Sequence, residues 1–384
     1  MNALVFDTQR GWETSKGLEK VQTDAPRLEE TNDPEDALAV IVKPLFSGFC
    51  GSDRGIWYRS AFKDMIHQSL AREDKAKRIT GHEFIGEIVE MGSLVRKHFG
   101  LREGQHVAAE SHIICENCYQ CQTGQSHVCT NEKILGISID GCFAQYLKIP
   151  AKILWPTNTD KIDLRVASIQ EPFGNAVHLC TQADLRGKTV IVLGCGTIGL
   201  FSILIAREWG AFKIIGIDPN PRQRAMAEAC GADEVLDLPK VDGSAHAINH
   251  DFVQQIRSSL PHQGADVVLE VAGLNSSVNY ALALARRGGM VMLFGLKGGV
   301  FQIPDFEKII MNGLEIKAVV GRQVFQTWHH TRALLENTRN GIQDKVLRVI
   351  LNNGVGTVIP FDGFQADAFE QSMLAHPKLT LQFS

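Results

Sequence analysis

The sequence predicts an α/β protein of two domains, one mostly β and one built on a doubly wound parallel sheet. The 384 residues exceed what a single small core needs. Apolar, β-branched runs separated by glycines and charged loops fill roughly the first 165 residues, whereas strands and helices alternate from about residue 186. A glycine-rich turn, GCGTIG, lies between a strand and a helix of this second region.

Composition and charge argue against two classes of partner. A net charge of −4 gives the chain no basic surface for nucleic acid. Thr189–Ala206 contains eighteen uncharged residues, the lower limit for a membrane-spanning helix, but its three glycines each weaken a helix interior by about 1 kcal/mol. We therefore expect a strand, a turn and a buried helix there, and no membrane partner. Residues 1–20 lack the apolar core of a signal peptide, so we expect a cytoplasmic protein with reduced thiols.

The first region has the pattern of β-structure. Leu38–Leu45 and Phe84–Val89 are apolar and β-branched, which predicts strands. Between them, Met65–Ile79 (MIHQSLAREDKAKRI) is charged and polar, which predicts a surface excursion in the form of a loop or a short helix.

From about Arg186 the pattern changes to strands that alternate with helices. The strand candidates are Thr189–Leu193, Lys213–Ile217, Val267–Val271, Met290–Phe294 and Glu315–Val319. The helix candidates are Ile198–Trp209, Pro221–Cys230 and Ser276–Ala285. This alternation predicts βαβ units and a parallel sheet. After about Arg322, one more helix candidate, Thr327–Asn340, is accompanied by short strands.

The stretch GCGTIG, Gly194–Gly199, predicts a dinucleotide site. It follows a strand and opens a helix, so a pyrophosphate would lie against free N–H groups at a helix N-terminus. The glycines allow a tight turn, close approach of the backbone to the pyrophosphate, and close packing of helix on strand. Asp218 ends the next strand, where a carboxylate binds the ribose hydroxyls and repels a 2′-phosphate. The sequence thus predicts NAD as the coenzyme, with Arg222 and Arg224 near enough to weaken that preference.

Four of the nine cysteines lie close together in CENCYQCQTGQSHVC, as Cys115, Cys118, Cys121 and Cys129. A disulfide-stapled loop and a closed metal site both need thiols at this spacing. Nine is an odd number, and the expected compartment keeps thiols reduced. Four thiolates can close a tetrahedron around one Zn²⁺ and leave no open position for chemistry. We therefore predict a structural zinc site that fixes this loop.

A second set of metal-binding residue types is spread along the chain. Cys50 lies in SGFCGSD, and His82 and Glu83 lie in GHEFIGE. Each is unremarkable alone, because a buried cysteine packs as a small hydrophobe and His–Glu pairs are common. A thiolate, an imidazole and an exchangeable position are, however, what a catalytic zinc requires.

Taken in order, these motifs resemble those of the zinc-dependent medium-chain alcohol dehydrogenases, along nearly the whole chain. Within that family, EPFGNAVH (Glu171–His178), DGCFAQYLKIPA (Asp140–Ala151) and GLEIKAVVGRQVFQTW (Gly313–Trp328) resemble segments of the threonine dehydrogenases. The resemblance implies a GroES-like catalytic domain and, inserted into it, a Rossmann coenzyme domain, with the active site in the cleft and a homotetrameric assembly. The implied domains are 1–170 with 322–384, which includes a structural zinc lobe at 110–130, and 171–321.

By motif position, the resemblance implies roles for individual residues of the catalytic domain. Cys50 and His82 are catalytic zinc ligands, and Glu83 is a third, exchangeable one. Glu171 stands where the family places a fourth ligand or a substrate-side carboxylate. Asp53 matches the acid that holds His82 in its metal-binding tautomer.

The remaining implied roles concern proton transfer and the coenzyme. Ser52 matches the hydroxyl that takes the proton of the substrate, and two segments after strand candidates border the nicotinamide half. The predicted coenzyme-binding residues are Gly194, Gly196, Thr197, Ile198, Gly199, Asp218, Phe294, Gly295, Leu296, Val319 and Val320.

Two departures from the threonine dehydrogenases concern the substrate. Those enzymes carry a histidine three residues after the relay hydroxyl, where this chain has Gly55. The segment between Cys50 and His82 is also longer than theirs, by the Met65–Ile79 excursion. Both changes fall beside the implied substrate pocket and leave the substrate open between threonine and a polyol, sugar or inositol.

The sequence therefore predicts an enzyme with two zinc ions per chain that transfers a hydride from a polar secondary alcohol to NAD. Glu171 favours an amino-alcohol or diol, because a bare alkyl chain would leave its carboxylate unpaired. A non-catalytic protein that senses NAD is one alternative, although a sensor has no need for the open metal site at Cys50, His82 and Glu83. A nucleic-acid-binding zinc module is another, but residues 115–129 contain no Lys or Arg.

Overall fold

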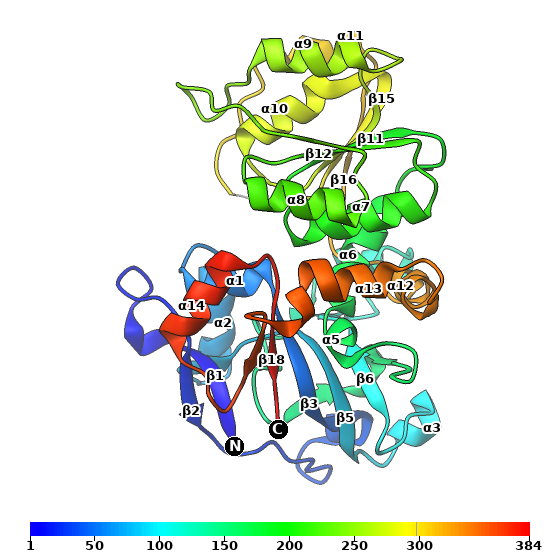
Figure 1. Cartoon of the computed structure of the whole chain (residues 1–384). Helices are drawn as coiled ribbons and strands as arrows, with labels where there is room; N and C mark the ends of the chain where they lie inside the picture. Colours follow the sequence, from blue (N-terminus) through cyan, green and yellow to red (C-terminus); the bar gives the residue numbers. More distant parts are fainter. Residues whose placement is uncertain (297) are drawn as a thin grey trace. The chain divides into compact units, whose positions relative to one another are not determined.

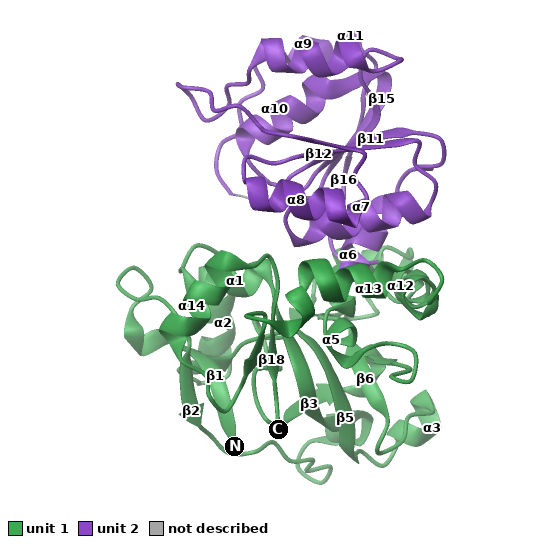
Figure 2. Cartoon of the chain, in the orientation of Figure 1, with its two compact units in different colours: residues 1–172, 323–384 green, residues 173–322 purple. Residues whose placement is uncertain are grey.

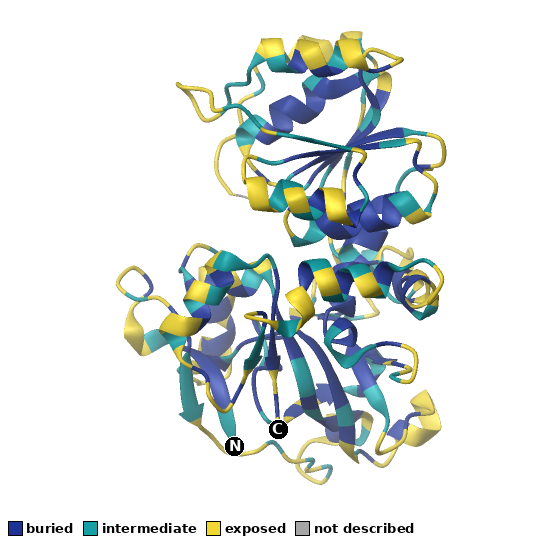
Figure 3. Ribbon diagram, viewed as in Figure 1, coloured by how far each residue is buried: buried dark blue, intermediate teal, exposed yellow. Residues whose placement is uncertain are grey.

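The chain begins in one folded unit, passes through a second and returns to end in the first (Figures 1 and 2). The computed structural model describes residues 1–296 and 298–384. Unit 1 comprises Met1–Pro172 and Gln323–Ser384, and unit 2 comprises Phe173–Arg322. Each unit has its own buried interior, which Figure 3 shows in dark blue.

The main sheet of unit 1 has seven strands in the order β10-β6-β5-β3-β18-β17, and β9 also pairs with β3. The strands are β3 (Ala39–Phe49), β5 (Glu83–Met91), β6 (His106–Ala109), β9 (Leu147–Pro150), β10 (Leu154–Pro156), β17 (Val358–Pro360) and β18 (Leu379–Gln382). β3 pairs antiparallel with β5, so that Gly48 lies opposite Glu83. β18, near the C-terminus, pairs antiparallel with β3, and Leu379 lies opposite Phe49. The end of β3, the start of β5 and the start of β18, which are far apart in the sequence, therefore lie side by side.

Two smaller sheets and several short helices complete unit 1. The first sheet has the order β2-β1-β4, and the second pairs β7 with β8. These strands are β1 (Asn2–Asp7), β2 (Glu19–Gln22), β4 (Lys77–Ile79), β7 (His112–Ile113) and β8 (Lys133–Ile134). The helices are α1 (Gly51–Trp57), α2 (Lys63–Arg72), α3 (Val95–Phe99), α4 (Tyr119–Gln122), α5 (Leu164–Ala167), α12 (Gln326–Glu336), α13 (Ile342–Lys345) and α14 (Ala366–Ala375).

Unit 2 is a six-stranded parallel sheet in the order β13-β12-β11-β14-β15-β16. Its strands are β11 (Thr189–Leu193), β12 (Lys213–Ile217), β13 (Glu234–Leu236), β14 (Ala265–Glu270), β15 (Ala285–Leu293) and β16 (Glu315–Ala318). Its helices are α7 (Thr197–Glu208), α8 (Pro221–Cys230), α9 (His250–Ser259), α10 (Asn275–Leu284) and α11 (Phe306–Met311), and α6 (Gln170–Thr181) enters it from unit 1. The strand order reverses between β11 and β14, the topological switch point at which α/β sheets of this kind bind ligands.

The predicted fold class is confirmed, with two differences in the elements. Of the two alternatives for the excursion Met65–Ile79, the short helix is correct: its first part belongs to α2, whose Ile66 and Leu70 are buried, and its last residues form β4, which was not predicted. In unit 2 the sequence analysis predicted no element at β13, α6, α9 or α11. Thr189–Ala206 forms β11, the glycine turn and part of α7. Across residues 1–296 and 298–384, no helix has both the length and the apolar character needed to cross a membrane.

Candidate active site and metal centres

Cys50, His82 and Glu83 converge at the end of β3. Because β3 ends at Phe49 and β5 begins at Glu83, the antiparallel register brings the residue after one strand beside the first residues of the other. One ligand atom from each of the three residues lies within 4.8 Å of the others. His82 and Glu83 are buried, and Cys50 is half-buried.

The chemistry of this group fits a zinc ion. A thiolate, an imidazole and a carboxylate are the ligand types that catalytic zinc sites use. Glu83 Oε1 is buried and makes no hydrogen bond to any described residue. Unpaired polar atoms of this kind are costly inside a protein unless a ligand or an ion satisfies them.

Two residues of the first turn of α1 lie against the imidazole. Ser52 Oγ lies 3.2 Å from His82 Nε2. Asp53 Oδ2 accepts a hydrogen bond of 3.0 Å from the Cys50 amide, and Asp53 Oδ1 lies 3.7 Å from His82 Nδ1, beyond hydrogen-bond length. Burial raises the pKa of Asp53 although His82 opposes the shift. The Asp53 carboxyl therefore lies where it can orient the ring of His82.

Lys378 is a residue of this site that the sequence analysis missed. It lies directly before β18, is 2% exposed, and donates a hydrogen bond of 3.1 Å to the carbonyl of Phe49 and another to Glu83 Oε2. A Cβ atom at Gly48 would lie 2.1 Å from the same Glu83 oxygen, so only glycine leaves room for this arrangement. A lone lysine near a chain end has no sequence pattern that marks it as buried.

Burial and neighbouring charges shift the pKa values of Glu83 and Lys378. Burial raises the pKa of Glu83, and Lys378 opposes that shift. Burial lowers the pKa of Lys378, but Glu83 and Cys50 outweigh burial and hold its pKa above the ordinary lysine value. Lys378 is therefore a cation next to the ligand group, and it donates to Glu83 Oε2, while Glu83 Oε1 has no hydrogen-bond partner among the described residues.

Glu171 lies in the first turn of α6 and is buried. Its Oε1 accepts a hydrogen bond of 2.7 Å from Ser111 Oγ. It is not a member of the group of converging ligand atoms formed by Cys50, His82 and Glu83. Its negative charge nevertheless helps to raise the pKa of Lys378.

Gly55, where the threonine dehydrogenases carry a histidine, is tightly enclosed. A Cβ atom there would lie 2.8 Å from the Cβ of Ala61, closer than side chains normally approach. The turn that follows α1 thus leaves no room for a side chain at this position without a local shift.

The four cysteines of the predicted structural zinc site converge in the loop after β7. One Sγ atom from each of Cys115, Cys118, Cys121 and Cys129 lies within 4.8 Å of the others, and none of these four forms a disulfide. Backbone amides donate to these sulfurs, for example from Cys118 to Cys115 Sγ at 3.3 Å. Backbone N–H groups of Cys121 and Thr130 lower the pKa of Cys118 to about 5. Four convergent sulfurs with amide donors fit a closed tetrahedral zinc site.

The glycine turn of unit 2 follows the geometry expected of a dinucleotide site. Gly194 has φ of +96°, and a Cβ atom at Gly199 would lie 2.0 Å from the Gly194 carbonyl oxygen. A Cβ atom at Gly196 would meet no atom within 4 Å, so that side of the turn is open to a ligand. Thr197 and Ile198 form the first turn of α7. The turn therefore presents a helix N-terminus to open space.

Asp218, directly after β12, is already engaged by the backbone. Its Oδ2 accepts from the Cys195 amide at 2.9 Å and its Oδ1 from the Asn220 amide at 2.8 Å. Arg224 donates to the Asp218 carbonyl and to Asp237 Oδ1. Asp218 thus links the glycine turn to the loop before α8, and Arg224 is held by its own acceptors.

The other predicted coenzyme residues follow the two strands at the far edge of the sheet. Phe294, Gly295 and Leu296 come after β15, and Val319 and Val320 come after β16. A Cβ atom at Gly295 would lie 2.1 Å from the Gly273 nitrogen, so the loop after β15 touches the loop after β14 through the backbone.

Glu270, which the sequence analysis missed, organises the loop that follows β14. It is fully buried, and its Oε1 accepts hydrogen bonds from the Ala272 amide, the Gly273 amide and Ser277 Oγ at 2.7–2.9 Å.

Comparisons with known proteins agree with both units. The profile of the zinc-binding dehydrogenases matches residues 197–337, and that of the alcohol dehydrogenase GroES-like domain matches residues 36–159. L-threonine 3-dehydrogenase of Caldanaerobacter subterraneus subsp. tengcongensis is 33% identical over 322 residues, which cover 84% of this chain and 85% of the relative.

Solved structures share the fold at lower identity. Galactitol-1-phosphate dehydrogenase from Escherichia coli superposes with a TM-score of 0.78 at 23% identity, over 100% of both chains. A zinc-binding dehydrogenase from Sinorhizobium meliloti, solved with NADP, gives 0.77 at 24% identity over 99% of this chain and 98% of the other.

Proposed function

The chain belongs to the zinc-binding alcohol dehydrogenases and is an oxidoreductase, and from this premise we propose that it oxidises a polar secondary alcohol with NAD as the hydride acceptor. The observation that carries the proposal is the convergence of Cys50, His82 and Glu83 beside the hydroxyl of Ser52. We assign the catalytic role to unit 1 and the coenzyme-binding role to unit 2.

In this proposal, Cys50 and His82 hold a catalytic zinc, and Glu83 is its exchangeable ligand. When bound, zinc supplies a Lewis acid that lowers the pKa of an alcohol, and the nicotinamide ring supplies a hydride acceptor. Asp53 fixes the imidazole of His82 so that Nε2 is the ligand atom. Lys378 keeps one oxygen of Glu83 engaged, which leaves a single carboxylate oxygen for the metal.

Proton removal falls to Ser52. Its Oγ lies 3.2 Å from His82 Nε2, the ligand nitrogen of this proposal. The hydroxyl is therefore next to the metal ligands, where an alcohol would bind. We propose that Ser52 Oγ accepts the substrate proton and passes its own proton outward. Since Gly55 offers no imidazole, the onward path runs through water or through ribose hydroxyls of the coenzyme.

Glu171 directs the choice of substrate. Its buried carboxylate accepts a hydrogen bond from Ser111. An anion at this place can pair with an amine of the substrate or accept a hydrogen bond from its second hydroxyl. We propose an amino-alcohol or a polyol as substrate, with threonine first because the relatives bear that name. A cyclic or linear polyol is the second candidate, favoured by Gly55 and by the longer segment before His82.

The cofactor and assembly proposals complete this function. We propose a second, structural zinc at Cys115, Cys118, Cys121 and Cys129, which makes two zinc ions per chain. We also propose a cytoplasmic setting, in which thiols stay reduced. We also propose that the chain assembles into a homotetramer.

The deciding experiment measures NADH formation by the zinc-loaded protein with threonine, polyols, inositols, sugars and simple alcohols. We expect turnover of threonine or of one polyol class, and little turnover of ethanol. Glu171→Gln should raise KM for the polar substrate by about 10-fold or more and leave KM for a simple secondary alcohol nearly unchanged. Ser52→Ala should lower kcat by roughly 10²-fold or more with either substrate.

Two outcomes would contradict the proposal. Efficient turnover of simple alcohols with none of threonine or any polyol would remove the polar-substrate assignment. Tight binding of NAD without turnover of any alcohol would favour a coenzyme-sensing protein instead.

A further inference from the structure

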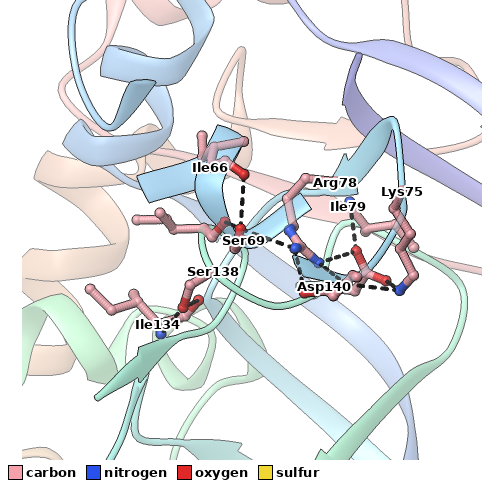
Figure 4. A network of polar contacts seen from close by, with 10 residues as sticks. Ile66, Ser69, Lys75, Arg78, Ile79, Ile134, Ser138 and Asp140 are labelled. Atoms are coloured by element: carbon pink, nitrogen blue, oxygen red, sulfur yellow. Dashed lines mark hydrogen bonds and ion pairs between the residues drawn. The ribbon is translucent and has the colours of Figure 1, made fainter. Parts of the chain in front are cut away.

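The chain segment that leads into His82 is anchored by a buried arginine. Arg78 lies four residues before His82, and its side chain is 0% exposed. Its guanidinium donates to Glu73 Oε1 at 2.7 Å and to Glu73 Oε2 at 3.1 Å. It also donates to Asp140 Oδ1 at 3.0 Å and to Ser69 Oγ at 3.2 Å (Figure 4). A buried cation needs such partners, because removing it from water costs several kcal/mol.

On its other side the same segment lies directly against the backbone of residues 140–143. Ile79 donates to Asp140 Oδ1 at 3.1 Å, and its carbonyl accepts from the Gly141 amide at 2.8 Å. The Gly81 carbonyl accepts from the Cys142 amide at 2.9 Å. A Cβ atom at Gly141 would lie 2.1 Å from the Gly81 oxygen, so the two backbones are in contact. A movement of residues 140–143 would therefore displace the segment that carries His82.

The Met65–Ile79 segment supplies the remaining hydrogen bonds and ion pairs around Arg78 and Asp140. Ser69 lies on α2, and its hydroxyl donates to the carbonyls of Ile66 and Ile137, at 2.9 and 3.4 Å. Glu73 ends α2, and Lys75 bridges Glu73 and Asp140 from the surface, at 3.1 and 3.0 Å. Figure 4 shows Ser69, Arg78 and Asp140 pointing toward one another from three different stretches of the chain. These bonds tie the extra segment to the residues that precede the metal ligands.

We propose that Arg78 is a positioning residue for the metal ligands His82 and Glu83, and that the longer Met65–Ile79 segment provides its partners. Arg78 links α2 to Asp140, and the backbone bonds of residues 140–143 then fix residues 79–81 next to the ligands. The inference rests on the proposed function, because it requires a zinc ion at Cys50 and His82. An arginine that only stabilises unit 1 would affect folding without affecting that metal in particular.

Metal release measures this role directly. The zinc-loaded protein is mixed with the chromogenic chelator 4-(2-pyridylazo)resorcinol, and zinc release is followed over time. We expect two kinetic phases, one per zinc, which His82→Ala and Cys118→Ser assign by deleting one phase each. Arg78→Met should accelerate release from the His82 site by about 10-fold, as for other groups that orient metal ligands, and leave the four-cysteine phase unchanged.

Two further variants keep the test decisive if Arg78→Met folds poorly. Asp140→Asn keeps the shape of the side chain and removes its charge, and it should accelerate the same phase by a smaller factor. Lys75→Met is the matched control, because it removes a contact to the same two carboxylates from a half-exposed side chain and leaves the guanidinium in place. We expect its release kinetics to match those of the wild type.

Other results would overturn the inference. Equal acceleration of both phases would mean a general loosening of unit 1. A lower Tm with both phases unchanged would mean a purely structural role for Arg78. A wild-type protein that releases only one zinc would instead refute the proposed function, before Arg78 is tested at all.

Discussion

At the scale of single residues, a buried lysine balances the charge beside the candidate zinc ligands. Lys378 and Glu83 are 295 residues apart in the chain, yet both are almost fully buried and hydrogen-bonded to each other. Breaking a buried ion pair by removing one partner is costly, because the other charge is left without compensation. Lys378 therefore stabilises unit 1 and also fixes which oxygen of Glu83 is left for the metal.

We predict that Lys378→Met lowers the free energy of unfolding by about 3–5 kcal/mol and kcat by roughly 10–100-fold. Urea denaturation and steady-state kinetics measure the two effects. Lys378→Arg keeps the cation and should retain most of the activity. Lys16→Met removes a lysine from an exposed pair with Glu370 and should change neither quantity. Similar kcat losses in the Met and Arg variants would show that shape, and not charge, is what matters at Lys378.

Asp218 is the residue to which we assign the coenzyme preference, and its carboxylate also bonds to the backbone. Its carboxylate also accepts from the Cys195 and Asn220 amides. We predict that Asp218→Ala and Asp218→Asn both shift the kcat/KM ratio toward NADP by roughly 10-fold or more, since each removes the charge that repels a 2′-phosphate. Kinetics with both coenzymes measure the ratio. A shift in the Ala variant alone would point to distortion of the glycine turn, and a wild type that prefers NADP would contradict the role assigned to this carboxylate.

At the scale of elements, the four-cysteine loop is the part of unit 1 for which we propose a structural ion. Residues 115–129 contain only the short helices α4 and Ser126–Val128, and Cys129 is the one fully buried cysteine of the four. We therefore expect a loop with so little core of its own to depend on metal binding for its order.

We predict that Cys118→Ser lowers the zinc content from two to one per chain and reduces stability by at least about 2 kcal/mol, or roughly 4–8 °C in Tm. Elemental analysis and calorimetry measure these quantities. Cys50→Ser is the matched variant, and it should lose the other zinc and the activity with a smaller change in Tm. One zinc or none in a fully active wild type would contradict the two-site assignment.

At the scale of the whole molecule, unit 2 exposes apolar side chains next to an edge strand. β16 is the last strand of the sheet order, and Ile316 on it is exposed. On α11, Ile310 is 72% and Met311 is 68% exposed. Exposed apolar side chains on an edge strand and on the helix before it in the chain are typical of surfaces that bind another chain.

We therefore predict that the wild type elutes well above its monomer mass of 42.3 kDa, and that the double variant Ile310→Asp, Met311→Asp shifts to a smaller species. Light scattering coupled to size-exclusion chromatography gives the masses. Phe212→Asp is the control, because Phe212 is 68% exposed elsewhere in unit 2 and should leave the mass unchanged. A monomeric wild type would contradict the proposed assembly.

The sequence by itself determined the features that depend on neighbouring residues. β11, β12 and α8 have the predicted bounds, because a short apolar run, a capping Asn220 and a closing glycine are local properties. The four cysteines and the glycine turn are likewise recognisable from spacing, since a loop of that length can close on itself without any other part of the chain.

Only the tertiary structure decided which distant residues meet. The register of β3 on β5 brings Cys50 to His82, and the pairing of β18 with β3 adds Lys378. The roles of Arg78 and Glu270 also became visible only there. The physical reason is that burial of a charged side chain depends on partners far away in the sequence, and no local pattern of residues records which partners those will be.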